Sequence, residues 1–499
     1  MPADLVSTAD IVPLADPTVA QRSQATLGFL TKVSYGLGEV ADGVKTAALE
    51  TFLFFYYVQV AGLSGSMAGL AVMIALLFDG FIDPAIGNFS DNLRSPIGRR
   101  HPFLYLSALP LAVCVFLLFT PPAGLHSWGL FCWMLGFTII SRVALSLYFV
   151  PHMALGAELT TDFRERVTVA SYRALFGHVG RVVALWIAFS FFFKSTARFP
   201  EGQLNPAAYG PFALACGLIS AGVILVSALG TQRRATEVYH QAREASLRHH
   251  SGSTWRNLTT AFRIRDFTVL FFAILISYIL GGVQAALNIH LNTYYWRLPS
   301  AGIQWVFLFS SFGFMAGTFL AKPLADRFDK KPAYVACVIL SVLMIALPIV
   351  LAQLGLYPVD NKPLLVVCLA ANTFIAGVIG GPAFAISAAM LADVTDVYED
   401  RFGVRSEGFL FGASAFTRKA SLGVGGAIAG VALDLIHFPR GVPVDAVPHM
   451  ATVKLALLFG PAMLIFSCIS MSLLWTYGLD RRRHAEVLQR LSERARVAP

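Results

Sequence analysis

The chain contains a succession of apolar stretches, each long enough to cross a lipid bilayer as a helix, which takes about 20 residues. In lipid the backbone must satisfy its own hydrogen bonds, so such stretches are expected to be helical. Only 13% of the 499 residues are charged, whereas soluble domains contain about a quarter. We therefore predict an all-α membrane protein with twelve transmembrane helices. The predicted spans are 33–60, 66–89, 103–121, 127–150, 168–193, 208–229, 267–293, 302–323, 333–353, 364–390, 407–436 and 452–478.

Basic residues are concentrated in alternate loops, namely 90–102, 154–167, 230–266 and 324–332, and in the tail after 478. Loops rich in Lys and Arg remain on the cytoplasmic side of a membrane. With an even number of spans, both termini are then cytoplasmic, as in a multi-pass plasma (inner) membrane protein. The net charge of +9 follows from this topology. No basic stripe with interleaved aromatic residues indicates nucleic-acid binding.

Residues 230–266 form the longest polar stretch and divide the chain into two halves of six predicted spans. Two short patterns recur in both halves. Asp91 follows the second span as Asp326 follows the eighth, 235 residues later, and Pro151 corresponds to Pro382, 231 residues later. A nearly constant offset is typical of duplicated membrane bundles. We predict a cytoplasmic tail (1–32), an N-terminal six-helix bundle (33–229), a cytoplasmic linker (230–266), a C-terminal six-helix bundle (267–478) and a cytoplasmic tail (479–499).

Two acidic residues, Asp79 and Asp83, lie inside the second predicted span. Four residues apart on a helix, they are separated by about 40° of rotation and point to the same side. An ionised side chain at the bilayer centre costs about 2.5–3.5 kcal/mol even on lenient scales. We interpret the pair as a site at which a cation or proton is bound. Alternatively, both acids pair with basic residues and only fasten helices together.

Three sequence blocks resemble the major facilitator superfamily and, within it, the glycoside-pentoside-hexuronide:cation symporters of the melibiose-permease group. The blocks are Lys32-Val-Ser-Tyr-Gly-Leu-Gly with Phe54-Phe-Tyr-Tyr, Phe78-Asp-Gly-Phe-Ile-Asp-Pro-Ala-Ile-Gly87 with Gly98-Arg-Arg-His-Pro102, and Leu391-Ala-Asp-Val-Thr-Asp396 with Arg405-Ser-Glu-Gly408 and Lys419. The resemblance implies two pseudo-symmetric six-helix bundles and symport of a sugar, glycoside or related small solute with a cation, by alternating access. An anionic or lipid-like solute (a hexuronide or lysophospholipid) and a non-transporting sensor are the alternatives.

The same resemblance assigns the coupling cation to Asp79 and Asp83, with the Ser146 hydroxyl as a ligand and Lys419 close by. Lys419 needs a carboxylate partner when the ion is absent, and either Asp can serve. Ile82 stands where the group has an Asn in its sodium site. The loss of this oxygen weakens the case for Na⁺, so that Na⁺ and H⁺ both remain open.

The sugar-binding pattern of the group is not kept. Its Asp on the fourth span aligns with Phe149, and its Asp on the first span aligns with Gly43, beside Asp42 and one turn after Glu39. Arg142 shares a helix face with Ser146 and Phe149, and Arg173 matches an Arg at the family's solute pocket. Two guanidinium groups facing the cavity would favour an anionic solute. Alternatively, Arg142 pairs with Glu39, Asp42 or Glu50 as a structural bridge.

The seventh span carries Gln284 and Asn288 on one face, where they either contact solute hydroxyls or hold helices together. Charged residues at the cytoplasmic ends are expected to act as gates, or simply to be solvated loop charges that fix topology. Gly87, Asp91, Arg99 and Arg100 match the superfamily's cytoplasmic loop motif, and Asp326 with Arg327 is the echo in the second half. The opposing network is expected from Glu158, Asp162, Arg166, Asp393, Asp396 and Arg405.

The sequence lacks a Walker loop, HExxH, Gly-x-Ser-x-Gly and Cys/His metal spacing. We therefore expect no enzymatic activity, no cofactor and no metal centre. A buried pair of acids without a repeated filter-like segment fits a carrier better than a channel. The expected partners are a small-molecule solute, the coupling cation and the lipid bilayer, and the protein is expected to be a monomer.

Overall fold

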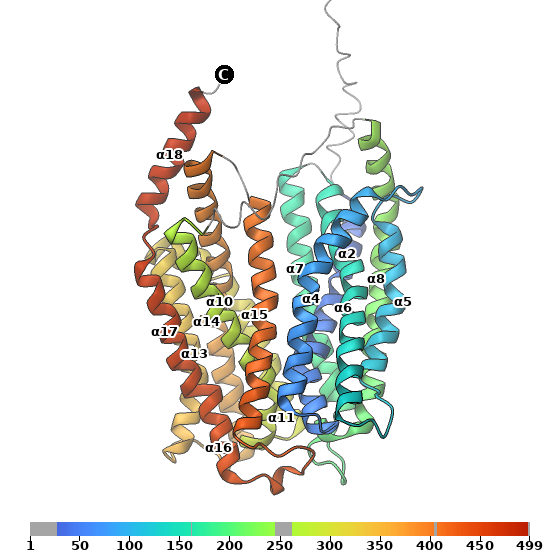
Figure 1. Ribbon diagram of the computed structural model, residues 1–499, viewed down its shortest axis with the longest axis vertical. Helices are drawn as coiled ribbons and strands as arrows, with labels where there is room; N and C mark the ends of the chain where they lie inside the picture. Colours follow the sequence, from blue (N-terminus) through green and yellow to red (C-terminus); the bar gives the residue numbers. More distant parts are fainter. Residues whose placement is uncertain (1–26, 161, 245–261, 404–406, 498–499) are drawn as a thin grey trace, which may run out of the picture.

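The computed structural model describes residues 27–160, 162–244, 262–403 and 407–497, and within these ranges it contains helices but no strands. Long helices run side by side along the longest axis of the molecule (Figure 1). The helices of the first half, blue to green, form one group, and those of the second half, yellow to red, form the other. The division agrees with the two bundles expected from the sequence.

The first half contains α2 (Phe29–Gly38), α3 (Val40–Lys45), η1 (Thr46–Leu53), η2 (Tyr56–Val60), α4 (Gly65–Asn92), α5 (His101–Leu118), α6 (Ser127–Glu158), α7 (Phe163–Ile187), η3 (Ala188–Phe192), η4 (Gly202–Leu204) and α8 (Pro206–Glu244). The second half contains α10 (Arg265–His290), η5 (Leu291–Tyr295), α11 (Ser300–Thr318), α12 (Ala321–Phe328), α13 (Lys330–Gln353), α14 (Lys362–Phe402), α15 (Glu407–Leu435), η6 (Val444–Ala446), α16 (His449–Leu457), η7 (Leu458–Ala462), α17 (Met463–Leu473), η8 (Leu474–Thr476) and α18 (Arg481–Val497).

Nine helices among the described residues are long and apolar enough to cross a membrane, or ten if α11 and α12, bent by 50°, form one span. The first and eleventh predicted spans are helical as well, but they are not among these nine or ten. Five charged side chains between Lys32 and Glu50 interrupt the apolar character of the first one. The number of twelve spans therefore stays a prediction.

The first and seventh predicted spans end in the same way, although their sequences differ. Each widens into a short π-helix, η2 in one half and η5 in the other, and such widened turns are often found at functional sites. The same two backbone bonds close each end: Ala61 N to Tyr56 O (2.9 Å) with Leu63 N to Tyr57 O (2.8 Å), and Trp296 N to Leu291 O (3.1 Å) with Leu298 N to Asn292 O (3.0 Å). Every atom pair recurs after 235 residues, the offset already found for Asp91 and Asp326.

Helices α4 and α15 come from different halves and lie side by side (Figure 1). Their backbones approach closely because glycines face one another at four-residue spacing, Gly65 and Gly69 on α4 against Gly426 and Gly430 on α15. A Cβ atom added to Gly69 would lie 2.5 Å from the carbonyl oxygen of Gly426, closer than real Cβ atoms come. The close contact between α4 and α15 therefore requires glycine at position 69, because any larger residue there would collide with the opposite backbone.

The N-terminus of α4 is capped by both halves of the molecule. Ser64 Oγ accepts a hydrogen bond from Met67 N, and the carboxylate of Asp434, at the end of α15, accepts from Gly65 N (3.1 Å) and Ser66 N (2.8 Å). A carboxylate at a helix N-terminus satisfies free N–H groups and complements the helix dipole. This end of the interface between the halves is thus held by both packing and charge.

We predict that Gly69→Leu lowers the free energy of unfolding by about 1–3 kcal/mol, because the added side chain forces α4 and α15 apart. Thermal unfolding of the purified protein in detergent measures the change. Gly136→Leu on α6 is the matched control, since a Cβ at Gly136 meets no atom within 4 Å. Equal melting temperatures for the two variants would contradict the close contact.

Candidate functional site

Two hydrogen-bonded pairs of side chains, one turn apart, join α4 to α6 in the first bundle. Arg142 Nη1 donates a hydrogen bond to Asp79 Oδ2 at 2.8 Å, and one turn further along both helices Ser146 Oγ donates to Asp83 Oδ1 at 2.6 Å. Each pair joins residues 63 positions apart, so the four-residue spacing on α4 is met by the same spacing on α6. The two acids that share a face therefore find two polar partners that also share one.

Lys419 of α15 reaches the same two acids from the second half. Its Nζ atom donates to Asp83 Oδ2 and lies 3.5 Å from Asp79 Oδ2. The glycine contact between α4 and α15, nearer the start of α4, brings this lysine within reach. Among the described residues, these are the ion pairs that join the two halves of the molecule.

The five side chains of this central cluster (Asp79, Asp83, Arg142, Ser146 and Lys419) differ in exposure. Asp79 and Arg142 are each 5% exposed, whereas the side chains of Asp83 and Lys419 are 26% and 22% exposed. One ion pair is therefore buried within the first bundle, and the other, between the two bundles, is partly exposed.

All four residues expected to bind the cation thus lie together, and Arg142, which the sequence assigned to the solute, lies with them. The suggestion that Arg142 pairs with Glu39, Asp42 or Glu50 is wrong, because its partner in the structure is Asp79. Its position on α6 showed which face it occupies but not which neighbouring helix that face meets. Phe149 is half-buried on the same helix, three residues beyond Ser146.

A second group of charges lies on the first predicted span. Lys45 is 3.1 Å from Asp42 and 3.8 Å from Glu50, and it is more buried than either acid. Glu39 lies 3.9 Å from Arg173 Nε on α7. Asp42, Glu39 and Arg173 were predicted from the sequence as site residues, whereas Lys45, three residues after Asp42, was not. It neutralises two acids that would otherwise be costly in the membrane.

A buried histidine adjoins Glu39. His152 is fully buried on α6 and stacked between the rings of Tyr35 and Tyr148, with Nε2 3.0 Å from Tyr35 O and Nδ1 3.7 Å from Glu39 Oε2. Gly38 leaves room for this stack, since an added Cβ would collide with the Tyr148 hydroxyl. A lone histidine in an apolar helix gives no sequence signal of such a neighbourhood, so His152 could not be predicted to lie beside Glu39.

The two amides of α10 behave differently. The side chain and carbonyl oxygens of Asn288 both accept from Asn292 Nδ2, at 2.8 and 2.9 Å, so its oxygen is used within the helix. Gln284 Nε2 is a buried donor without a partner among the described residues. Gln284 thus offers a buried unpaired donor, and the Nδ2 group of the part-exposed Asn288 makes no hydrogen bond with another described residue.

At the basic end of the first bundle, Arg100 holds together the ends of α4 and α6. Its guanidinium donates to Ser90 Oγ (2.6 Å), to Asp91 Oδ1 and to Glu158 Oε1 (2.8 Å from Nη2). Arg99 Nη2 also donates to Glu158 Oε1 at 2.8 Å but is far more exposed. Three charged residues of the sequence motif, Asp91, Arg99 and Arg100, thus lie together around Glu158.

Other residues predicted for this gate are used locally. Asp162 caps α7 by accepting from Glu165 N at 2.8 Å, and Arg166 Nε donates to Thr160 O at 2.9 Å. A Cβ at Gly87 would meet Val150 at 3.5 Å, an ordinary contact. The helix packing at this position therefore does not require a glycine.

At the basic end of the second bundle, the charged cluster formed by described residues does not involve the side chains of Asp326 and Arg327, the pair expected from the sequence. Lys330 Nζ donates to Asp393 Oδ2 at 2.6 Å, and His484 Nε2 of α18 lies 2.9 Å from Asp396 Oδ2. Asp326 uses its carbonyl to accept from Arg481, and the Arg327 guanidinium lies over the Phe328 ring. Asp393 follows Glu158 by 235 residues, so its ion pair with Lys330 corresponds to the pair of Glu158 with Arg100. Arg405 lies outside the described residues.

No hydrogen bond or ion pair between described residues joins Glu158, Asp162 or Arg166 to Asp393 or Asp396, so the network between the bundles stays a prediction. Glu158 bonds within the first bundle, and Asp393 and Asp396 bond within the second. The motif positions alone did not reveal that each cluster ties helices of its own bundle.

At the opposite end, hydrogen bonds join the two halves directly. Tyr294 Oη donates to Gln59 Oε1 (3.0 Å), Ser300 Oγ to Gln203 Oε1 (2.8 Å), and Gln304 Nε2 to Ser190 Oγ (2.7 Å). Gln203 Nε2 also donates to Thr293 Oγ1 (3.0 Å) and Gly202 N to Ser300 Oγ (3.0 Å), and the Asp434 cap of α4 adds two more bonds between the halves. The two halves are thus fastened at the end away from the basic loops.

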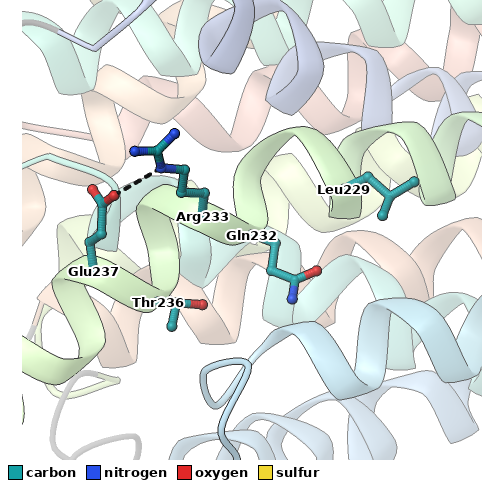
Figure 2. Close-up of a pocket in the computed structure, with 5 residues that line it drawn as sticks. All are labelled: Leu229, Gln232, Arg233, Thr236 and Glu237. Carbon is teal, nitrogen blue, oxygen red and sulfur yellow. Dashed lines mark hydrogen bonds and ion pairs between the residues drawn. The ribbon is translucent and has the colours of Figure 1, made fainter.

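A surface hollow of about 460 Å³ lies on α8, lined by Leu229, Gln232, Arg233, Thr236 and Glu237 (Figure 2). All five residues come from a single helix, and Arg233 and Glu237 pair with each other at 3.3 Å. A solute would be contacted from one side only, so this hollow is not the candidate site. Among the described residues, no group of three or more His, Cys, Asp or Glu side chains could hold a metal ion.

The fold is shared with solved transporters. A crystal structure of a D-xylose-proton symporter superposes with a TM-score of 0.58 over 91% of this chain and 98% of that one, at 13% identity. A family model described as MFS/sugar transport protein matches residues 34–481, and the chain belongs to this family. It is therefore an integral membrane protein of a transporter family.

Curated relatives cover most of the chain. A putative glycoside/cation symporter of Escherichia coli is 26% identical over 93% of this chain and 95% of its own length. An isoprimeverose transporter of Lactiplantibacillus pentosus is 25% identical over 81% and 79%, respectively. The resemblance to glycoside:cation symporters found in the sequence is thereby confirmed.

We predict that Arg100→Ala destabilises the protein by about 1–3 kcal/mol, because it leaves the buried Ser90 hydroxyl without its partner and removes the buried guanidinium that joins Asp91 of α4 to Glu158 of α6. Arg99→Ala is the matched control and should cost at most about 1 kcal/mol, since Arg99 is exposed and makes one ion pair. Thermal unfolding in detergent distinguishes the two. Similar losses would show that Arg100 does not organise the cluster.

Proposed function

We propose that the protein is a cation-coupled symporter that moves a sugar, glycoside or related small solute across the plasma (inner) membrane by alternating access. The family and the names of the two relatives support this class of activity. The observation that carries the proposal is the ion pair between Lys419 in one half and Asp83 in the other. Alternating access moves one bundle against the other, so a bond between them must break and reform in each cycle.

The central cluster gives a physical basis for coupling. When Lys419 withdraws from Asp83, the carboxylate is left exposed to the cavity and its charge must be compensated by a cation or a proton. When Lys419 returns, that cation is released. The coupling cation and Lys419 therefore exclude one another, and this exclusion links cation binding to the position of the bundles.

The solute is proposed to lie between the bundles, next to the charged first span. The half-buried carboxylates of Asp42 and Glu50, together with Arg173 and the free amide of Gln284, offer donors and acceptors for solute hydroxyl groups. The case for an anionic or lipid-like solute relied on two guanidinium groups in the cavity. Arg142 is engaged with Asp79. The balance therefore favours a hydroxyl-rich neutral solute.

The basic loops favour a cytoplasmic location for both termini. In that orientation, the hydrogen bonds between the halves close the outer end of the molecule, and the end bearing Arg100 and Lys330 faces the cytoplasm. The structure then corresponds to an inward-facing state of a carrier that functions as a monomer.

Uptake of radiolabelled pentoses, hexoses and their glycosides into proteoliposomes tests the proposal, under an imposed gradient of H⁺ or of Na⁺. We predict that at least one of these solutes accumulates, and that Asp83→Asn reduces accumulation to the level of empty liposomes. Asp445→Asn, at an exposed position of η6, is the matched control and should accumulate solute as the unaltered protein does. Accumulation that survives Asp83→Asn would contradict the assignment of Asp83 to coupling.

A further inference from the structure

We propose that Arg142 serves as a permanent internal cation for Asp79, so that only Asp83 exchanges the coupling ion, and that this ion is a proton and not Na⁺. The inference rests on the proposed function, and it identifies the ion and the exchanging group. Three observations support it: the charge balance of the central cluster, the bundle to which each residue belongs, and the oxygen atoms within reach of Asp83.

The central cluster is electrically balanced without any bound ion. Asp79 and Asp83 contribute two negative charges, and Arg142 and Lys419 contribute two positive charges. A charge buried in a membrane is tolerated when an opposite charge lies beside it. A further cation can therefore enter only when one of the two basic groups leaves.

The two basic groups differ in their freedom to leave. Arg142 belongs to the same bundle as Asp79 and is buried with it, so movement of one bundle against the other does not separate them. Lys419 belongs to the opposite bundle, and its side chain and that of Asp83 are partly exposed. Withdrawal of Lys419 leaves a single negative charge on Asp83. One monovalent cation per cycle restores neutrality.

The atoms around Asp83 suit a proton. Ser146 Oγ is the neighbouring hydroxyl, at 2.6 Å, while Asp79 Oδ2 already accepts from Arg142 and lies 3.5 Å from Lys419. Hard cations such as Na⁺ require several oxygen ligands, whereas a proton needs one carboxylate oxygen.

The proton balance of the cycle is simple. As Lys419 withdraws, a proton from the outer solution adds to a carboxylate oxygen of Asp83, which becomes neutral and can donate to Ser146 Oγ. As Lys419 returns in its ammonium form, Asp83 gives the proton to water on the inner side. Asp79, Arg142, Ser146 and Lys419 are the polar and charged groups found in contact with the two carboxylates, from α4, α6 and α15.

Equilibrium dialysis of the purified protein against radioactive Na⁺, with choline replacing Na⁺ in the reference, tests the inference. The unaltered protein should bind no saturable Na⁺. Arg142→Gln removes the internal cation and adds an amide oxygen beside Asp79, and it should gain about one bound Na⁺ per chain. Arg142→Lys keeps a positive charge and should bind none, and the double variant D79N/R142Q should lose the gain.

Saturable Na⁺ binding by the unaltered protein would overturn the proposal, as would a folded Arg142→Gln that binds no Na⁺. If Arg142→Gln does not fold, Na⁺ binding by the unaltered protein still tests the proposal. Solute accumulation driven by a Na⁺ gradient alone refutes the inference and leaves the proposed symport intact. Accumulation driven by a H⁺ gradient, without Na⁺ binding, supports both, and failure of both gradients to drive any solute refutes the proposed function itself.

Discussion

A charge inside a membrane is stable only beside an opposite charge, and this constraint organises the centre of the protein. Two acids on α4 meet an arginine on α6 and a lysine on α15, and the cost of placing each of them in lipid is offset by the others. One pair is confined to a single bundle and the other crosses between bundles. The same electrostatic requirement thus stabilises the fold and makes the relative position of the bundles sensitive to a cation.

Close packing of helices from the two halves brings Lys419 within reach of Asp83. Lys419 reaches Asp83 because facing glycines let α4 and α15 approach closely, and because Asp434 caps the start of α4 from the other half. At the same end, the bonds of Gln59 and Gln203 to the second half close the structure. Contacts between bundles gather at this end and at the centre, whereas the basic ends are tied within each bundle. Such an arrangement is suited to rocking of the bundles about the fastened end.

Much of the central cluster could be predicted from the sequence. The four-residue spacing of Asp79 and Asp83 placed both on one side of a helix, and the need of an intramembrane lysine for a carboxylate linked Lys419 to them. The partner of Arg142 could not be predicted, because helical spacing gives the face of a residue and not the helix that covers it. For the same reason the sequence pointed to Asp326 and Arg327, while the partner of the predicted Asp393 is Lys330, which was not predicted.

By itself the sequence determined the helical class, the approximate spans, the family and the presence of buried charges, because hydrophobicity, helical periodicity and the cost of charge in lipid are local properties. Only the tertiary structure decided how those charges are paired, that His152 and Lys45 adjoin acids, and that the halves are fastened at one end. These facts depend on which faces of distant helices meet, and that is set by packing, such as the absence of side chains at Gly69 and Gly426.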